Sequence, residues 1–277
     1  HWPMGNKETF AYWILEREFV RKAKEAGMAK PWSEDRVFQE TYFCNVRRED
    51  DRVTKWIRQR FNEYGAEDPA IPNMMMARMV NKTTSLEALG FPWGVWLPEH
   101  WRDVMSRKGA WGSAYIVSTN GRPVPKHEYV QGLLEQAWQR FAGVGAATLP
   151  PTCAAHHKAI QGLSGMGSFM SAQVVADLKN TAGHPLQNAT DFKTFASHGP
   201  GSLRGLAWFH GVDRLVPSKF SAALASARQW CYSDTSVASI VEGLCNQDLQ
   251  NCFCEYDKYM RVNNGKGRSK RKYPGRF

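Results

Sequence analysis

Residues 160–179 read IQGLSGMGSFMSAQVVADLK, and they decide the fold because they place a glycine-containing turn between two apolar helical segments. Gly165 and Gly167 permit a tight turn and a close approach of the backbone to another group. The first N–H groups of the second helix would face an anion bound at the turn. One face of that helix carries apolar residues at helical spacing, namely Phe169, Ala172, Val175 and Ala176. The stretch therefore predicts two helices joined by a turn that suits phosphate.

This stretch resembles the helix–hairpin–helix motif, whose limits here are about residues 157–180. Such motifs contact the phosphates of duplex DNA without reading the bases, and their turn carbonyls often hold a monovalent cation. The resemblance implies that Gly165, Gly167 and Ser168 contact the DNA backbone. The alternative interpretation is a close-packed helical turn that binds no ligand.

The residues that follow the turn bear on catalysis. In helix–hairpin–helix DNA glycosylases, an aspartate downstream of the turn serves the chemistry at a flipped base, and Asp191 lies close to that place. The bifunctional members carry a lysine shortly after the second glycine. This chain has Ser168, Phe169 and Met170 there, which disfavours a lyase that works through a Schiff base. A glycosylase without lyase activity stays open.

The rest of the chain predicts further helices. Hydrophobic periodicity indicates helices over residues 8–27, 33–43, 50–65, 73–89 and 126–141, whereas 114–118 is the one β-like run. Ser33 is the expected N-cap of the second helix. The first helix is expected to bury one face, formed by Phe10, Ile14, Leu15 and Phe19. We expect a mainly α fold, with one helical, glycosylase-like catalytic domain over residues 1–260 and a basic flexible tail over residues 261–277.

Positive charge is concentrated at the carboxyl end. The 277 residues include 36 Lys and Arg against 26 Asp and Glu, a formal net charge of +10. Seven basic residues and no acidic residue lie within residues 261–277. Such a tail is typical of a flexible arm that binds nucleic acid, with a solvated terminus as the alternative. No apolar run is long enough to span a bilayer, so we expect no membrane partner.

The cysteines predict free thiols. The chain has six cysteines and no recognisable export signal, which is typical of a reducing compartment. Four of them lie within residues 231–254, but the single residue between Cys252 and Cys254 fits poorly with iron–sulfur ligation. We therefore expect no metal centre, and no cofactor other than a monovalent cation at the helix–hairpin–helix turn.

Residues 42–52 group charged side chains at the start of a predicted helix. The stretch contains Asn45, Arg48, Glu49, Asp51 and Arg52, and on one helix Arg48 and Arg52 would share a face. Such a cluster could bind a doubly charged anion and supply carboxylates for proton transfer. A solvated charged face is the alternative interpretation.

Two later stretches have a similar character. Residues 198–206 are expected to form a glycine-rich loop that cradles phosphate through the N–H groups of Gly199, Gly201 and Ser202 and ends near Arg204. Residues 250–261 carry a second charged cluster on a predicted helix, comprising Glu255, Asp257 and Lys258.

Together these stretches resemble a bacteriophage family, the α-glutamyl/putrescinyl thymine pyrophosphorylases, which are amino acid:DNA transferases. The Asn-x-x-Arg-Glu-x-Asp-Arg pattern starts at Asn45, and the Gly-Pro-Gly-Ser-x-Arg-Gly-Leu pattern starts at Gly199. The Cys-Glu-x-Asp-Lys-Tyr pattern starts at Cys254. The helix–hairpin–helix lies between the first two patterns, and the resemblance spans about residues 10–261 without the tail.

The resemblance implies a DNA-modifying transferase. Its substrate would be double-stranded phage DNA in which 5-pyrophosphoryloxymethyluracil replaces thymine, and its second substrate a free amino acid or polyamine that takes the place of pyrophosphate. The target base would be flipped out of the duplex. We expect a monomer in the cytoplasm of the infected bacterial host.

Particular residues are candidates for this chemistry. The candidate catalytic carboxylates are Asp191, Glu49 and Asp51, and either Asp191 or Glu49 would take the proton of the incoming ammonium group. The candidates for binding pyrophosphate, the amino acid and the flipped base are Asn45, Arg48, Arg52, Ser202, Arg204, Glu255, Asp257 and Lys258. Two other function classes stay open: a monofunctional DNA glycosylase that releases a free base, and a non-catalytic DNA-binding module.

Overall fold

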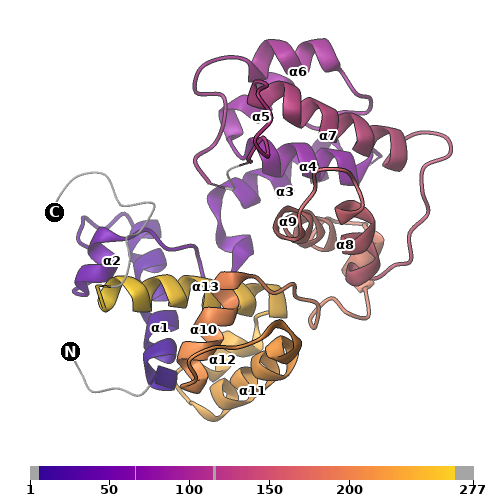
Figure 1. Cartoon of the computed structure of the whole chain (residues 1–277). Coiled ribbons are helices and arrows are strands. Elements are labelled where there is room, and N and C mark those ends of the chain that lie inside the picture. The colour runs from indigo at the N-terminus through magenta and orange to yellow at the C-terminus, as the bar shows by residue number, and fades with distance from the viewer. Residues whose placement is uncertain (1–5, 66, 115–116, 266–277) are drawn as a thin grey trace. The chain divides into compact units, whose positions relative to one another are not determined.

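The computed structural model describes residues 6–65, 67–114 and 117–265 (Figure 1). These ranges contain thirteen α-helices, three short 3-10 helices and no strand, which confirms the expectation of a mainly α fold. The likeness to a glycosylase stays a prediction. The β-like run of residues 114–118 has its centre outside the described residues, at Tyr115 and Ile116.

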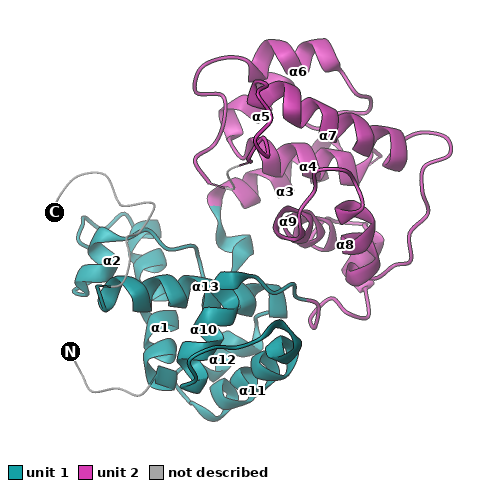
Figure 2. Cartoon of the chain, viewed as in Figure 1, with its two compact units in different colours: residues 1–51, 196–277 teal, residues 52–195 magenta. Residues whose placement is uncertain are grey.

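The chain divides into two compact units, where the sequence had indicated one domain (Figure 2). Unit 1 comprises residues 1–51 and 196–277, and unit 2 comprises residues 52–195. Each unit has its own cluster of buried apolar side chains. Helical periodicity shows which face of a helix is buried but not which other helix covers it, so the division is not visible in the sequence.

Unit 1 is built from helices of both chain ends. Its elements are α1 (Asn6–Glu25), α2 (Arg36–Glu40), η1 (Arg48–Asp50), α10 (Pro200–His210), η3 (Pro217–Lys219), α11 (Phe220–Ser233), α12 (Ala238–Glu242) and α13 (Asn246–Asn263). Helix α10 packs along α13, and both contact α1. The core between them is aromatic: Phe10 stacks on Phe253 with ring centroids 4.1 Å apart, and Phe209 meets both rings edge-on.

Unit 2 is continuous in sequence. Its elements are α3 (Arg52–Tyr64), α4 (Ala70–Val80), α5 (Thr83–Leu89), α6 (Pro98–Met105), α7 (Lys126–Phe141), α8 (Cys153–Gln161), α9 (Ser168–Lys179) and η2 (Pro185–Asn188). Helix α4 is central, since it packs against both α7 and α9 and nearly all its side chains are buried. Its methionines belong to the core, since Met74, Met75, Met76 and Met79 are at most 2% exposed.

The buried stripe of α1 differs from the predicted one. Phe10 and Ile14 are fully buried, but Leu15 and Phe19 are exposed. The stripe continues instead through Arg17 and Glu18, which lie seven and eight residues after Phe10 and return to the same face. Apolar periodicity alone does not reveal charged residues on a buried face, although the positions of these two fit it.

Three helix boundaries also correct the predictions. Helix α2 begins after Asp35, whose carboxylate accepts the Val37 N–H, so Asp35 and not Ser33 is the N-cap. The predicted helix over residues 73–89 is two helices, because Asn81 adopts a left-handed conformation with φ 47°. The Asn81 side chain accepts a hydrogen bond from buried Arg78, which stabilises this break. Helix α3 begins at Arg52 and not at residue 50.

Candidate functional site

The first of the three family motifs, residues 45–52, lies mainly in an irregular segment of unit 1. Residues 48–50 form the short helix η1, and Asp51 then has extended backbone angles before α3 begins. Arg48 and Arg52 therefore do not share a helix face, and they belong to different units. The prediction of one helix from residue 50 was wrong because the acidic residues Glu49 and Asp50 lie in the first turn of η1, which ends before α3 begins.

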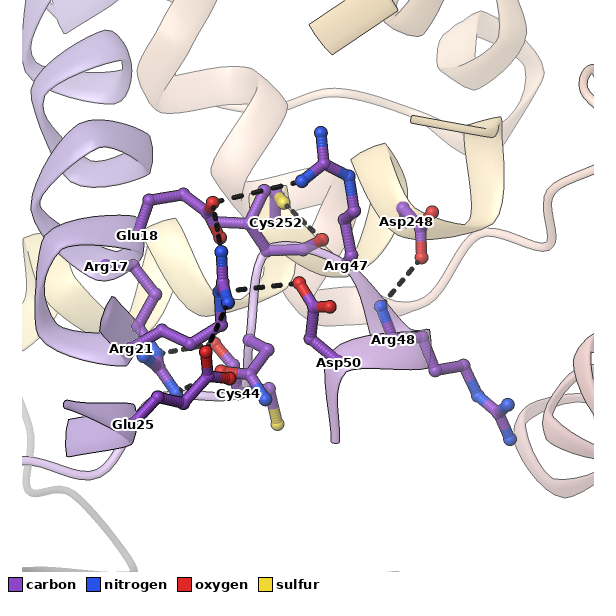
Figure 3. A network of polar contacts seen from close by, with 12 residues as sticks. Arg17, Glu18, Arg21, Glu25, Cys44, Arg47, Arg48, Asp50, Asp248 and Cys252 are labelled. Carbon is purple, nitrogen blue, oxygen red and sulfur yellow. Dashed lines mark hydrogen bonds and ion pairs between the residues drawn. The ribbon is translucent and has the colours of Figure 1, made fainter. Parts of the chain in front are cut away.

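Helix α1 holds this segment through a buried arginine (Figure 3). Arg17 is 3% exposed, and its Nε donates to the carbonyls of Phe43 and Cys44, each at 3.0 Å. Its Nη2 donates to the Asn45 side-chain oxygen at 2.6 Å. A charged donor with three acceptors fixes the path of residues 43–45. Sequence reasoning missed Arg17, although its position on the buried stripe of α1 was a usable signal.

A second set of charges from α1 reaches η1. Arg21 forms ion pairs with Glu18 at 3.0 Å and with Asp50 at 3.4 Å, and Arg47 lies 3.9 Å from Glu18. Figure 3 shows these side chains converging, while the guanidinium of Arg48 points away from them. The network orders the segment that carries Glu49 and Asp51.

Helix α13 holds the same segment from another side. The Glu255 carboxylate accepts the Cys44 N–H at 2.8 Å, and Lys258 pairs with Glu255 at 3.0 Å and donates to the Tyr42 carbonyl at 2.8 Å. Near the start of α13, Asp248 accepts the Arg48 N–H at 3.1 Å. The structure thus brings the first motif together with the third motif, residues 254–259. Glu255 and Lys258 of the third motif bind the backbone of residues 42–44.

The second motif, residues 199–206, forms the start of helix α10 and not a loop. Gly199 is the N-cap, and the buried Ser202 hydroxyl bonds to the Gly199 backbone at 3.0 Å. A Cβ on Gly201 would lie 2.5 Å from the Cys254 sulfur, and one on Gly205 would lie 1.9 Å from the Phe253 carbonyl oxygen. These two glycines serve the close packing of α10 on α13, so glycine content misled the loop prediction.

The packing of α10 on α13 also joins the second and third motifs. Arg204 Nε donates to the Asp257 carboxylate at 3.0 Å, and the carboxylate is 1% exposed. Trp208 Nε1 donates to its other oxygen at 3.2 Å. All three motifs therefore meet in unit 1, apart from Arg52.

The thiols in this region are protonated at neutral pH. Burial, together with the Glu255 charge, raises the pKa of Cys44 to about 12 and that of Cys254 to about 11. Neither cysteine is suited to act as a thiolate nucleophile. Within the described ranges, no three His, Cys, Asp or Glu side chains are grouped so that they could hold a metal ion.

The glycine-containing turn lies in unit 2, between α8 and α9. Gly165 has φ 95°, and a Cβ there would lie 2.7 Å from Leu133 and 2.9 Å from the Tyr129 hydroxyl, so the turn requires glycine. Gly167 is the N-cap of α9, and Ser168 is its first residue. An open groove of about 280 Å³ lies beside the turn, and its lining includes Arg122, Glu128, Tyr129, Gln136, Ser164 and Gly165.

Asp191 and its neighbour Phe192 tie this segment to the two helices that flank the turn. Its two oxygens accept the N–H groups of Cys153 and Ala154 at 2.8 and 2.9 Å, at the start of α8. Its neighbour Phe192 accepts a hydrogen bond through its carbonyl from buried Lys179, at the end of α9. Burial raises the pKa of Asp191, but the hydrogen bonds to its carboxylate, those from the Ala154 and Cys153 backbone foremost, together outweigh burial and lower it.

The predicted tail begins inside a helix. Helix α13 continues to Asn263, and Arg261 pairs with Asp257 at 3.0 Å. The remaining basic residues of the tail, from Lys266 onward, lie outside the described residues. In the part of the chain that the structure describes, no helix has the length and apolar character needed to cross a membrane.

The chain matches a known family. Residues 6–269 match the family model described as 5-hmdU DNA kinase, helical domain. No curated protein and no solved structure matches the chain.

Proposed function

The chain belongs to the family of 5-hmdU DNA kinase helical domains, and from this premise we propose that it is a DNA-modifying transferase. Membership links the chain to phage enzymes of thymine hypermodification that act on DNA. The proposed reaction replaces the pyrophosphate of 5-pyrophosphoryloxymethyluracil with an amino acid or a polyamine. Pyrophosphorylation of 5-hydroxymethyluracil by a kinase would create the leaving group that such a transferase displaces.

The observation that carries the proposal is the meeting of three motifs in unit 1. Segment 42–51, the start of α10 and the middle of α13 are far apart in sequence, yet they are joined by Glu255, Lys258 and Asp257. These are the stretches on which the resemblance to the amino acid:DNA transferases rests. A kinase reaction is less well supported, since the P-loop sequence G-x-x-x-x-G-K-[ST] does not occur among the 277 residues.

The proposed step is a substitution at the 5-methylene carbon. The bond from this carbon to the pyrophosphate oxygen breaks, and the oxygen leaves with the electron pair. A carbon–nitrogen bond forms, and the ammonium proton passes to a carboxylate. Arginine N–H groups near the leaving oxygens would stabilise their charge, and we assign Arg204 to this role because only its Nε is engaged by Asp257.

We assign the base to Glu49 and a positioning role to Asp191. A carboxylate whose two oxygens both accept backbone N–H groups, and whose pKa is lowered, is a weak proton acceptor. Asp191 would instead hold α8 and the turn in place. The turn, through Gly165, Gly167 and Ser168, would contact phosphates of the DNA duplex.

A monovalent cation at the turn belongs to the same proposal. The carbonyls of Leu163 and Ser164 each accept one hydrogen bond, from the Met166 N–H and from Gln136. Each oxygen keeps a second lone pair, so these carbonyls fit a cation that also contacts a DNA phosphate. We further propose that the protein works as a monomer in the cytoplasm of an infected bacterial cell.

A nucleoside assay tests the proposed function. Duplex DNA that carries 5-pyrophosphoryloxymethyluracil is incubated with the protein and with glycine, serine, glutamate or putrescine in turn, and the digested nucleosides are analysed by mass spectrometry. We expect one amine to give a new nucleoside with equimolar release of pyrophosphate. Unchanged nucleosides with every amine, or a free base with abasic sites, would contradict a transferase.

Two variants test the assignment of the base. Glu49→Gln is expected to lower turnover at saturating DNA by about a hundredfold or more, because general-base catalysis contributes at least that much. Asp191→Asn is the matched control, and it should lower turnover by less than about tenfold because its role is structural. The reverse order of effects would move the base to Asp191.

A further inference from the structure

Asp257 organises two arginines from different helices. Its Oδ2 atom accepts hydrogen bonds from Arg204 Nε on α10 and from Arg261 Nε on α13, each at 3.0 Å. Its Oδ1 atom accepts the Trp208 N–H at 3.2 Å. Because both Nε atoms lie 3.0 Å from the same oxygen, the two guanidinium groups are close neighbours.

The outer ends of both guanidinium groups are available to a ligand. Arg204 is 53% exposed and Arg261 is 36% exposed, whereas Asp257 is 1% exposed. The Nη1 and Nη2 atoms of the two arginines form no hydrogen bond with any residue that the structure describes. Eight N–H groups therefore remain around one buried carboxylate.

The local charge favours an anion. Two guanidinium groups against one carboxylate leave one excess positive charge, and the nearby Glu255 is balanced by Lys258 at 3.0 Å. Guanidinium groups bind phosphoryl oxygens through paired N–H donors. Because Asp257 already orders both side chains, a ligand would lose less affinity to their immobilisation.

We propose that Arg204 and Arg261 together form a site for a phosphoryl anion, which takes the pyrophosphate that the reaction releases. The identity of this anion rests on the proposed function, and the new element is Arg261. Its position in the sequence predicts that Arg261 belongs to the basic tail. In the structure Arg261 lies in the last turn of α13, beside the second and third motifs.

Direct binding of inorganic pyrophosphate to the full chain tests the site, without DNA or amine. Calorimetry is expected to show that Arg261→Gln and Arg204→Gln each weaken binding by about tenfold or more, the typical worth of a charge-assisted hydrogen bond. Arg36→Gln is the matched control, because Arg36 is also a cation of unit 1 and is 86% exposed beside Glu40. It should leave the affinity unchanged. Equal affinity of Arg261→Gln and the unaltered protein would overturn the proposal.

Two further measurements distinguish a pyrophosphate site from a nonspecific positive charge and from a contact to the DNA backbone. Arg261→Lys keeps the charge but loses the forked donor, so it should bind pyrophosphate nearly as weakly as Arg261→Gln, and full affinity would overturn the paired geometry.

Binding of unmodified duplex DNA should be almost unaffected by Arg261→Gln. If this variant weakens DNA binding and spares pyrophosphate, the anion is a backbone phosphate and the assignment to pyrophosphate is overturned. These measurements do not depend on turnover, so they can fail while the transferase assay succeeds, and the reverse.

Discussion

Each unit contains one buried aspartate that is bonded by two arginines, and the two clusters differ in what their arginines do. In unit 2, Asp177 is bonded by Arg78 at 2.7 and 2.9 Å and by Arg58 at 3.0 Å. In unit 1, Asp257 is bonded by Arg204 and Arg261 at 3.0 Å each. Arg78 is fully buried and Arg58 is 13% exposed, whereas the arginines of Asp257 are 53% and 36% exposed.

The difference shows how one set of residue types serves two purposes. Arg78 also donates to Thr54 and Asn81, so its guanidinium group has partners within the fold on several sides. The cluster joins α3, α4 and α9. It thereby holds α9, the helix that directly follows the glycine-containing turn, against the rest of unit 2. The Asp257 cluster leaves the outer donors of both arginines toward solvent. Exposure of the cation, and not the presence of the ion pair, separates a structural cluster from a candidate binding site.

The largest effect is expected where the structural cluster is broken. Asp177→Asn leaves the buried charge of Arg78 without its carboxylate, and we expect a loss of about 3–5 kcal/mol in the free energy of unfolding. Urea unfolding measures the loss, and hydrogen exchange should localise it to α3, α4 and α9.

Arg107→Gln is the matched control for that variant. Arg107 and Asp103 form a pair on unit 2 that is more than half exposed on both sides, so its loss should change stability by less than about 0.5 kcal/mol. A loss below about 1 kcal/mol for Asp177→Asn would show that the cluster of unit 2 does not hold its three helices together.

The next effect concerns the packing that creates the cluster of unit 1. Gly205→Ala would place a Cβ 1.9 Å from the Phe253 carbonyl, so α10 must move away from α13. We expect a loss of about 3 kcal/mol, together with weaker pyrophosphate binding because Arg204 moves away from Asp257.

Gly132→Ala provides the comparison in unit 2. Gly132 lies within α7, and a Cβ there meets nothing within 4 Å. This variant should therefore gain about 0.5–1 kcal/mol, since alanine favours a helix over glycine. A stable Gly205→Ala protein with unchanged pyrophosphate affinity would contradict the role of the close packing.

A third loss of stability, smaller than the two above, is a pH dependence that belongs to unit 2. Burial lowers the pKa of His184 to about 4, with a contribution from the nearby His156, and burial also lowers the pKa of His156. In an unfolded chain, histidine titrates near about 6.5. As the pH falls through this window, the unfolded state takes up protons that the folded state does not, so stability decreases.

We expect unit 2 to lose about 2 kcal/mol of stability between about pH 7 and about pH 5. Urea unfolding at the two pH values, followed by hydrogen exchange in α8, measures this loss. The double variant His156→Gln with His184→Gln should abolish most of it. A variant that keeps the full pH dependence would show that other groups are responsible.

Much of the fold could be predicted from local sequence. The helix–turn–helix over residues 160–179, the buried methionines of α4 and the helical character of residues 250–261 all follow from short-range periodicity and glycine placement. The first motif was harder to predict. Its charged residues were recognised, but η1 replaced the expected start of α3, and the arginines of α1 that hold it were missed.

The sequence by itself determined the helical class and the candidate motifs, because each of these depends on residues that are close together along the chain. Tertiary structure decided that helices from both ends form unit 1, that Asp191 accepts the first two N–H groups of α8, and that Arg261 joins Arg204 on Asp257. These features depend on the partner that each side chain finds across the core. Periodicity shows which face is buried, but the identity of the partner follows only from the packing of the helices.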